Sequence, residues 1–125
     1  MTKLDNPNID DIVIRPTDAR ALNARAGEVA ETLALMANAH RLRILCRLAE
    51  GEASVGVLVQ EVDLSQSALS QHLARLRAGG LVTTRREAQT IFYSLAGAET
   101  HAIMAALYEV FCAHGTDTGG RAVRA

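Results

Sequence analysis

The chain has 125 residues, of which 49% are hydrophobic but only 3% aromatic, and a formal net charge of −1. This length predicts one domain with a core of aliphatic residues and alanine, and the near-zero charge excludes a strong overall attraction to polyanions. No stretch has the pattern of a signal peptide or the length of a membrane span, so we expect a cytoplasmic protein without a membrane partner.

The two ends of the chain differ in pattern from its middle. Residues 1–17 are polar, contain both prolines and show no sustained hydrophobic period, which predicts a flexible N-terminal arm. A single domain is expected over residues 18–114, and it begins with a long helix that Thr17 or Asp18 caps and that runs to about Ala37. The Gly-rich residues 115–125 predict a flexible C-terminal tail.

Three shorter helices are expected next. The second runs from about His40 to Glu50, with leucines along one side. Ser54 and Ser65 have the residue type and position of N-caps for a third and a fourth helix. The glycine pair at 79–80 ends the fourth helix, because glycine readily adopts the left-handed conformation that a helix end requires.

Two strands and a last helix complete the pattern. The segments LVTTRR and TIFYSL are expected to be two strands joined through Glu87, Ala88 and Gln89, which predicts a β-hairpin. A final helix is expected from about Gly97 to Ala113. The order predicts a mainly α fold with a two-stranded β-hairpin wing, which is the winged helix-turn-helix arrangement.

The fourth helix has one apolar and one polar side. Leu69, Leu73 and Leu76 recur at helical spacing and are expected to face the core. The polar side begins with Ser and Gln, which both donate and accept hydrogen bonds and can read base edges in the major groove. Arginines that suit phosphates follow. We therefore predict double-stranded DNA as a partner, contacted by eight residues of this helix: Ser65, Gln66, Ser67, Ser70, Gln71, His72, Arg75 and Arg77.

The hairpin adds a basic wing to this surface. Residues 65–94 contain four arginines and one glutamate, and such a local excess matters more for phosphate binding than the net charge. We expect Thr84, Arg85, Arg86 and Gln89 to contact DNA. Two alternatives stay open: the helix face is ordinary surface, and the wing is a solvated edge strand guarded by charge.

The segment SQSALSQHLARLRAGGLVTTRRE, preceded by NAHRLRILCRLAEGEAS, resembles the ArsR family of bacterial winged-helix repressors, over about residues 30–113. The resemblance implies an ArsR-type homodimer that binds an imperfect inverted repeat in operator DNA and is released when an inducer acts. The family often has Pro where Ala39 stands and Gly where Ala88 stands. Since Ala tolerates positive φ poorly, we expect a different turn at the wing tip.

The last helix carries more apolar surface than one contact face uses. The resemblance implies that the first and last helices form the dimer, and this surplus supports the same conclusion. The alternative is that this surface is only the domain's own core. The dimer-interface candidates are Val29, Leu33, Ile103, Leu107 and Val110.

Neither type of metal site common in the family is complete in this sequence. The third helix, SVGVLVQEV, lacks Cys, His and Asp, and on the last helix His101 has Met104 three residues on instead of a second donor. We therefore predict no metal and no cofactor, although a Cys/His site across the dimer stays open. We also predict no enzyme activity, because Cys112 beside His114 has no orienting group or oxyanion motif.

The inducer is suggested by a narrower resemblance. The ILC of the second helix and LYEVFC of the last are similar to the sulfide-responsive SqrR/BigR-type subgroup of the family. This implies that Cys46 and Cys112 are a redox-sensing pair joined by persulfide chemistry, which weakens DNA binding. The implied inducer is glutathione persulfide or inorganic polysulfide. Two alternatives stay open: each thiol is a small buried hydrophobe, or the inducer is a metal ion or a general oxidant.

The chemistry of the pair leads to two expectations. A plain disulfide needs Cα atoms within about 7 Å, so a slightly wider pair would select persulfides, which leave a longer bridge, over peroxide. In addition, His40, Arg43 or Arg47 would lower the pKa of the Cys46 thiol if one of them faced it.

Overall fold

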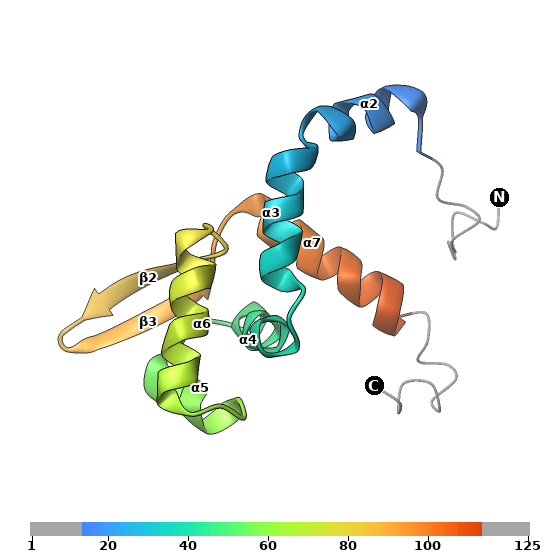
Figure 1. The fold of residues 1–125 in the computed structure, drawn as a ribbon. Helices are drawn as coiled ribbons and strands as arrows, with labels where there is room; N and C mark the ends of the chain where they lie inside the picture. Colours follow the sequence, from blue (N-terminus) through green and yellow to red (C-terminus); the bar gives the residue numbers. More distant parts are fainter. Residues whose placement is uncertain (1–13, 114–125) are drawn as a thin grey trace.

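The computed structural model describes residues 14–113, which form six α-helices, a π-helical turn and a small sheet (Figure 1). Helix α4 lies at the centre and contacts α3, α6, α7 and β3. The predicted tail lies outside the described residues, as does most of the predicted arm. None of the described helices combines the length and apolarity needed to cross a bilayer. In chain order the elements are α2 (Pro16–Ala24), α3 (Ala26–Met36), α4 (Ala39–Ala49), β1 (Ala53–Ser54), α5 (Val55–Glu61), α6 (Gln66–Ala78), β2 (Val82–Glu87), β3 (Thr90–Leu95), α7 (Ala98–Tyr108) and the π-helical turn η2 (Glu109–Ala113).

The long first helix predicted from Thr17 or Asp18 to Ala37 is instead two helices, and it begins earlier. Pro16 occupies the first turn of α2, where its missing N–H costs nothing. The break falls at Arg25, whose φ of −105° and ψ of 14° depart from helical values. The Arg25 side chain binds Glu28 on α3 at 2.6 Å and Glu99 on α7 at 3.0 Å, so the break is tied to both helices.

Three of the helix starts have side-chain caps. The Asn38 side chain accepts a hydrogen bond from the Arg41 N–H at 3.0 Å, so α4 begins at Ala39. Ser54 and Ser65 cap α5 and α6 by accepting N–H groups three residues ahead, at 3.2 and 3.1 Å. Both serine caps predicted from the sequence are confirmed.

The core is built around the apolar sides of α4 and α6. The three predicted leucines of α6, Leu69, Leu73 and Leu76, are all fully buried. Ile44, Leu45 and Leu48 of α4 belong to the same cluster, and its remaining members come from α3, α5, the sheet and the residues next to them. The helical period of the leucines therefore predicted the buried side of α6 correctly, which leaves its polar side exposed.

The predicted two-stranded wing is confirmed as the β2–β3 hairpin, and a further short strand, β1, extends it to a three-stranded sheet in the order β1-β3-β2. β2 and β3 pair antiparallel from Val82 opposite Leu95 to Glu87 opposite Thr90. The additional strand, β1, pairs through Ala53 opposite Tyr93. It is only two residues long, too short to show an alternating pattern in the sequence.

The wing tip is a two-residue loop, Ala88 and Gln89, and Ala88 has a φ of +57°. The expectation of a different turn, made because Ala disfavours positive φ, was therefore wrong. Among the described non-glycine residues, only Ala88 has a positive φ. A positive φ at the first loop residue alone is the pattern of a type II′ hairpin turn.

Replacing Ala88 by Gly is expected to raise the free energy of unfolding by about 0.5–1 kcal/mol. Left-handed geometry costs an L-residue about 1–2 kcal/mol, and the greater chain entropy of Gly offsets part of the gain. Urea unfolding at one protein concentration measures the difference. Ala74→Gly on the exposed side of α6 is the control and should lower stability by about 1 kcal/mol. A destabilised Ala88→Gly variant would contradict this reading of the turn.

Candidate DNA interface and dithiol site

The exposed side of α6 carries uncharged hydrogen-bonding groups. Gln66, Ser67, Ser70 and Gln71 are all exposed, while Leu69 between them is buried. The helix N-terminus therefore presents a row of donors and acceptors without charge. Such side chains suit base edges, because each can donate and accept in the groove.

An open hollow of about 460 Å³ lies between the start of α6 and the wing. Its lining brings together Gln66 and Ser70 from α6 with Gln89 from the hairpin loop. These three predicted DNA contacts come from two elements, the helix and the hairpin loop, and here share one surface. Ser54 and Gly56, at the start of α5, form the opposite wall.

Three arginines on this side are available to phosphates. Arg75 and Arg77 lie exposed in the last turn of α6, and Arg86 lies exposed on β2. Within residues 14–113 none of them forms an ion pair with a carboxylate. Thr84, the remaining predicted contact on β2, is half-buried.

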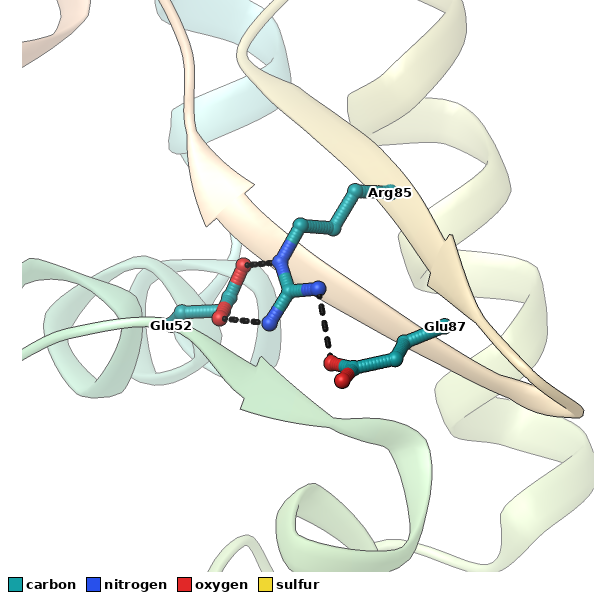
Figure 2. Close-up of polar contacts among 3 residues, drawn as sticks. All are labelled: Glu52, Arg85 and Glu87. Atoms are coloured by element: carbon teal, nitrogen blue, oxygen red, sulfur yellow. Dashed lines mark hydrogen bonds and ion pairs between the residues drawn. The ribbon is translucent and has the colours of Figure 1, made fainter.

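Arg85 differs from Arg75, Arg77 and Arg86 because two carboxylates hold it (Figure 2). Its Nε and Nη2 donate to both oxygens of Glu52, at 2.6 and 2.9 Å, and its Nη1 donates to Glu87 at 3.0 Å. The guanidinium also lies 4.5 Å from the ring centre of Phe92. Arg85 lowers the pKa of the Glu52 carboxyl through this hydrogen bonding. The predicted DNA contact is thus occupied within the protein, by a glutamate 33 positions earlier that the sequence reading missed.

The salt dependence of DNA binding should separate the two wing arginines. Arg86→Ala is expected to reduce the slope of log K against log salt concentration by about two, because a two-fold dimer loses one phosphate contact in each protomer. Arg85→Ala is the matched variant and should leave the slope nearly unchanged, since Glu52 and Glu87 already neutralise that guanidinium. Fluorescence anisotropy over a salt series measures both slopes. Equal losses would show that Arg85 leaves its carboxylates to bind DNA.

His72 is placed differently from the other predicted contacts. Its ring is half-buried, with Nδ1 3.3 Å from Nη1 of Arg41 and the ring centre 5.7 Å from that of His40. Burial lowers the pKa of His72, and the positive charges of Arg41, His40 and Arg75 lower it further. The prediction that His72 contacts DNA is not supported by this orientation, which points it toward α4.

The two cysteines lie on the surface of the protein, on different elements. Cys46 is on α4, Cys112 is in η2, and both thiols are free and exposed, so neither is the buried hydrophobe that was the alternative. Partial burial raises the pKa of Cys46, and the charges of Cys112 and Glu50 raise it further. Cys112 is thus near enough to act on Cys46 electrostatically.

The cations expected to activate Cys46 do not do so. The pKa of its thiol is raised, and none of the three basic neighbours in sequence contributes to the shift. Arg47 instead binds Glu61 and donates to the Gly51 carbonyl at 3.0 Å. The expectation that His40, Arg43 or Arg47 lowers the pKa of Cys46 was therefore wrong.

Large apolar side chains are exposed on α2, α3 and the end of α7. Two of the five predicted interface residues belong to this surface: Leu33 is 49% exposed and Val110 is 53% exposed. Val29 is half-buried, whereas Ile103 and Leu107 pack partly against the protein's own core. This exposed set is the candidate for the predicted dimer interface, and we refer to it as the apolar dimer surface; it comprises Leu22, Leu33, Tyr108, Val110 and Phe111.

A metal ion held by side chains needs a group of about three donor residues close together. Within residues 14–113 no three His, Cys, Asp or Glu side chains lie together in such a group. His101 uses its Nδ1 in a contact with the Gly97 carbonyl at 2.8 Å. His114, considered with it as a donor, lies outside the described residues.

The helices α4–α6 followed by the β2–β3 hairpin define a winged helix-turn-helix protein, with α6 in the position of the recognition helix. Residues 38–84 match the model of the arsR family of bacterial regulatory proteins. The transcriptional activator HlyU of Vibrio cholerae is 46% identical over 97 residues, which cover 78% of this chain and 90% of that protein. The chain belongs to the ArsR family.

Solved structures agree with this assignment. The crystal structure of the transcriptional repressor BigR from Xylella fastidiosa matches with a TM-score of 0.71 and 43% identity, over 76% of this chain and 97% of that one. A homodimeric winged helix-turn-helix DNA-binding domain from Mycobacterium bovis, described as a possible ArsR-family regulator, matches with a TM-score of 0.63 and 33% identity. That match covers 68% of this chain and 79% of the other.

Proposed function

We propose that this protein is a homodimeric transcriptional repressor that releases operator DNA when persulfide chemistry joins Cys46 to Cys112. The observation that carries the proposal is the placement of two free, exposed thiols that interact electrostatically, one on α4 and one in η2. The ArsR-family fold supports the DNA-binding part, and the similarity to BigR, described as a transcriptional repressor, supports repression.

DNA binding by two copies would use the α6 surface and the wing. In a two-fold dimer the recognition helices enter successive major grooves about one helical turn apart, so the operator is an imperfect inverted repeat. Gln66, Ser70 and Gln89 would contact bases from the shared hollow, and Arg75, Arg77 and Arg86 would contact phosphates.

The sulfur chemistry requires only the two thiols and a persulfide donor. A thiolate of the pair attacks the outer sulfur of glutathione persulfide, forms a protein persulfide and releases glutathione thiolate. The second thiolate attacks the sulfur bonded to the first cysteine, closes the bridge and expels HS⁻, so the transferred sulfur is the two-electron oxidant. If a second sulfur transfer extends the persulfide on the first cysteine, the second thiolate can attack the middle sulfur atom and expel HS⁻. The bridge that forms then contains one more sulfur atom than a plain disulfide.

Release of DNA follows from where the bridge would form. α4 contacts both α6 and α7, so a covalent link between α4 and η2 acts on the recognition helix and the apolar dimer surface together. A small change in the angle between protomers moves two recognition helices out of register with the operator. The bridge therefore favours a dimer geometry that fits DNA less well.

The test is operator binding by the reduced dimer before and after glutathione persulfide, with the intact mass of the same samples. We expect weaker binding together with a bridged species. Unchanged binding with free thiols would reject the persulfide switch. Release by peroxide with a plain disulfide would support a general oxidant as the inducer, and release by a metal ion with unmodified thiols would support a metal sensor.

The reaction of Cys46 should speed up with pH and with removal of Glu50. Because burial and neighbouring negative charge raise its pKa, Cys46 is mostly protonated at neutral pH, and its thiolate fraction grows as pH rises toward that pKa. Glu50→Gln lowers the pKa and should accelerate alkylation at about pH 7.5 by roughly twofold, since the weaker nucleophilicity offsets part of the gain.

This rate is best measured in a Cys112→Ser background, where Cys46 is the remaining cysteine of the chain. Glu87→Gln on the wing is the matched control and should leave the rate unchanged, because Glu87 is not among the groups that raise the pKa of Cys46. An equal or slower rate in Glu50→Gln would disprove this electrostatic assignment.

A further inference from the structure

Arg41 is a buried cation whose hydrogen-bond partners are all uncharged. Its side chain extends from α4 and is only 9% exposed. Nε donates to the Leu35 carbonyl at 2.6 Å and Nη2 to the Ala34 carbonyl at 3.4 Å, both in the last turn of α3. Nη1 meets Nδ1 of His72, on α6, at 3.3 Å. One guanidinium thus joins the end of α3 to the middle of α6.

The contact between Arg41 and His72 requires a neutral imidazole. A guanidinium can only donate, so Nδ1 of His72 must accept and cannot carry a proton. The charged groups that act on His72 are Arg41 and His40 from α4 and Arg75 from its own helix. All are basic, and together with burial they lower the pKa of His72. A proton there would remove the acceptor and place two positive charges together.

The same two helices meet again at the end of α6. A Cβ atom added at Gly79 would lie 2.1 Å from Cδ1 of Leu35, so the end of α6 packs directly against α3. Leu35 also provides the carbonyl that Arg41 binds. Two contacts about two turns apart along α6, at His72 and at Gly79, therefore set its position relative to α3.

We propose that Arg41 is a positioning residue for operator recognition, which holds α6 against the last turn of α3 through a neutral His72. The proposal rests on the proposed function, because it takes α6 as the helix that reads the operator and α3 as part of the dimer. When His72 takes up a proton, α6 loses this contact and its orientation within the dimer becomes less defined. Binding that depends on base contacts weakens, while binding to phosphates alone does not.

The test compares a specific operator with a scrambled duplex of the same length between about pH 7.5 and about pH 5. For the wild-type protein the ratio of the two affinities should fall by about tenfold on acidification, the size of one lost hydrogen bond to a charged group. Added positive charge strengthens binding to both duplexes alike, so the ratio isolates positioning from phosphate attraction.

Two substitutions at His72 and one control substitution test whether His72 causes the pH dependence of the affinity ratio. His72→Asn keeps an oxygen acceptor near the position of Nδ1 and does not titrate, so its affinity ratio should stay high over the whole range. His72→Leu has no acceptor, so its ratio should already be low at about pH 7.5 and change little. His101→Asn removes a histidine on α7 and should reproduce the wild-type profile. A profile in His72→Asn that falls like that of the wild type would overturn the proposal.

A second measurement needs no DNA. Hydrogen-exchange protection of the α6 amides should decrease on acidification in the wild type and persist in His72→Asn. If no variant binds the operator selectively, the proposed function fails, yet this difference would still support the Arg41–His72 contact as the group that holds α6. Equal loss of protection in both proteins would refute it, whatever the DNA result.

Discussion

Cys46→Ser and Cys112→Ser, each alone, are expected to bind the operator like the reduced wild type and to remain bound after glutathione persulfide. The wild-type protein should lose about 5- to 150-fold in affinity under the same treatment, the usual range for coupling between two sites. Both variants lack one end of the bridge, so the remaining thiol can carry added sulfur but cannot link α4 to η2. Because both thiols are exposed, serine should cost little stability.

Intact mass separates this mechanism from simpler ones. Persulfide-treated Cys46→Ser should gain sulfur or glutathione on Cys112 without losing the two protons that bridge formation removes. If either single variant still releases DNA, modification of one thiol is enough and the pair is not the switch. Peroxide provides the remaining control: rapid and complete plain-disulfide formation in the wild type would reject the selectivity for persulfides that a wide spacing predicts.

Local signals in the sequence predicted the DNA-facing part of the fold well. Ser54 and Ser65 cap helices as expected, because capping depends on residues within one turn. The spacing of Leu69, Leu73 and Leu76 predicted the buried side of α6 and, by exclusion, the exposed row of Ser and Gln. Both features can be predicted from local sequence, because they depend only on the helical period and on a favourable capping residue.

Features that depend on distant pairing could not be predicted in the same way. From the sequence alone, Arg85 is expected to be a free cation. Glu52 comes beside it only in the folded protein, because β1 pairs with β3. Likewise, Arg41 has the spacing of a buried position on α4, but its partners on α3 and α6 become visible only in the folded chain. The break at Arg25 also depends on a distant residue, because Glu99 of α7 helps to hold it.

The exposed apolar residues of the apolar dimer surface were predicted from the sequence only in part. The surplus of apolar residues on the last helix predicted an interface. It did not predict which of these residues are buried within the protomer itself. Ile103 and Leu107 pack partly against the core, while Tyr108 and Phe111, absent from the predicted set, are 59% and 71% exposed. The π-helical turn from Glu109 changes the rotation per residue, so the faces of α7 do not continue into this end.

Leu33→Asp is expected to convert the dimer into folded monomers and to lower operator affinity by at least about 100-fold. Leu33 is 49% exposed on α3, so the substitution should leave the core of the protomer intact. In a two-fold interface each substitution occurs twice, and burying the exposed half of two leucine side chains contributes about 1.5–3 kcal/mol. The aspartates would also lose solvation without a partner.

Sedimentation velocity at micromolar concentration measures the association, and circular dichroism verifies that the monomer is folded. Val57→Asp is the matched control, because Val57 is an exposed apolar residue on α5, away from the apolar dimer surface, and its substitution should leave the dimer intact. The loss of operator affinity follows because a monomer offers one recognition helix to an inverted repeat and about half the phosphate contacts. A Leu33→Asp protein that stays dimeric would exclude this residue from the interface, and a folded monomer with full operator affinity would exclude the dimer as the DNA-binding form.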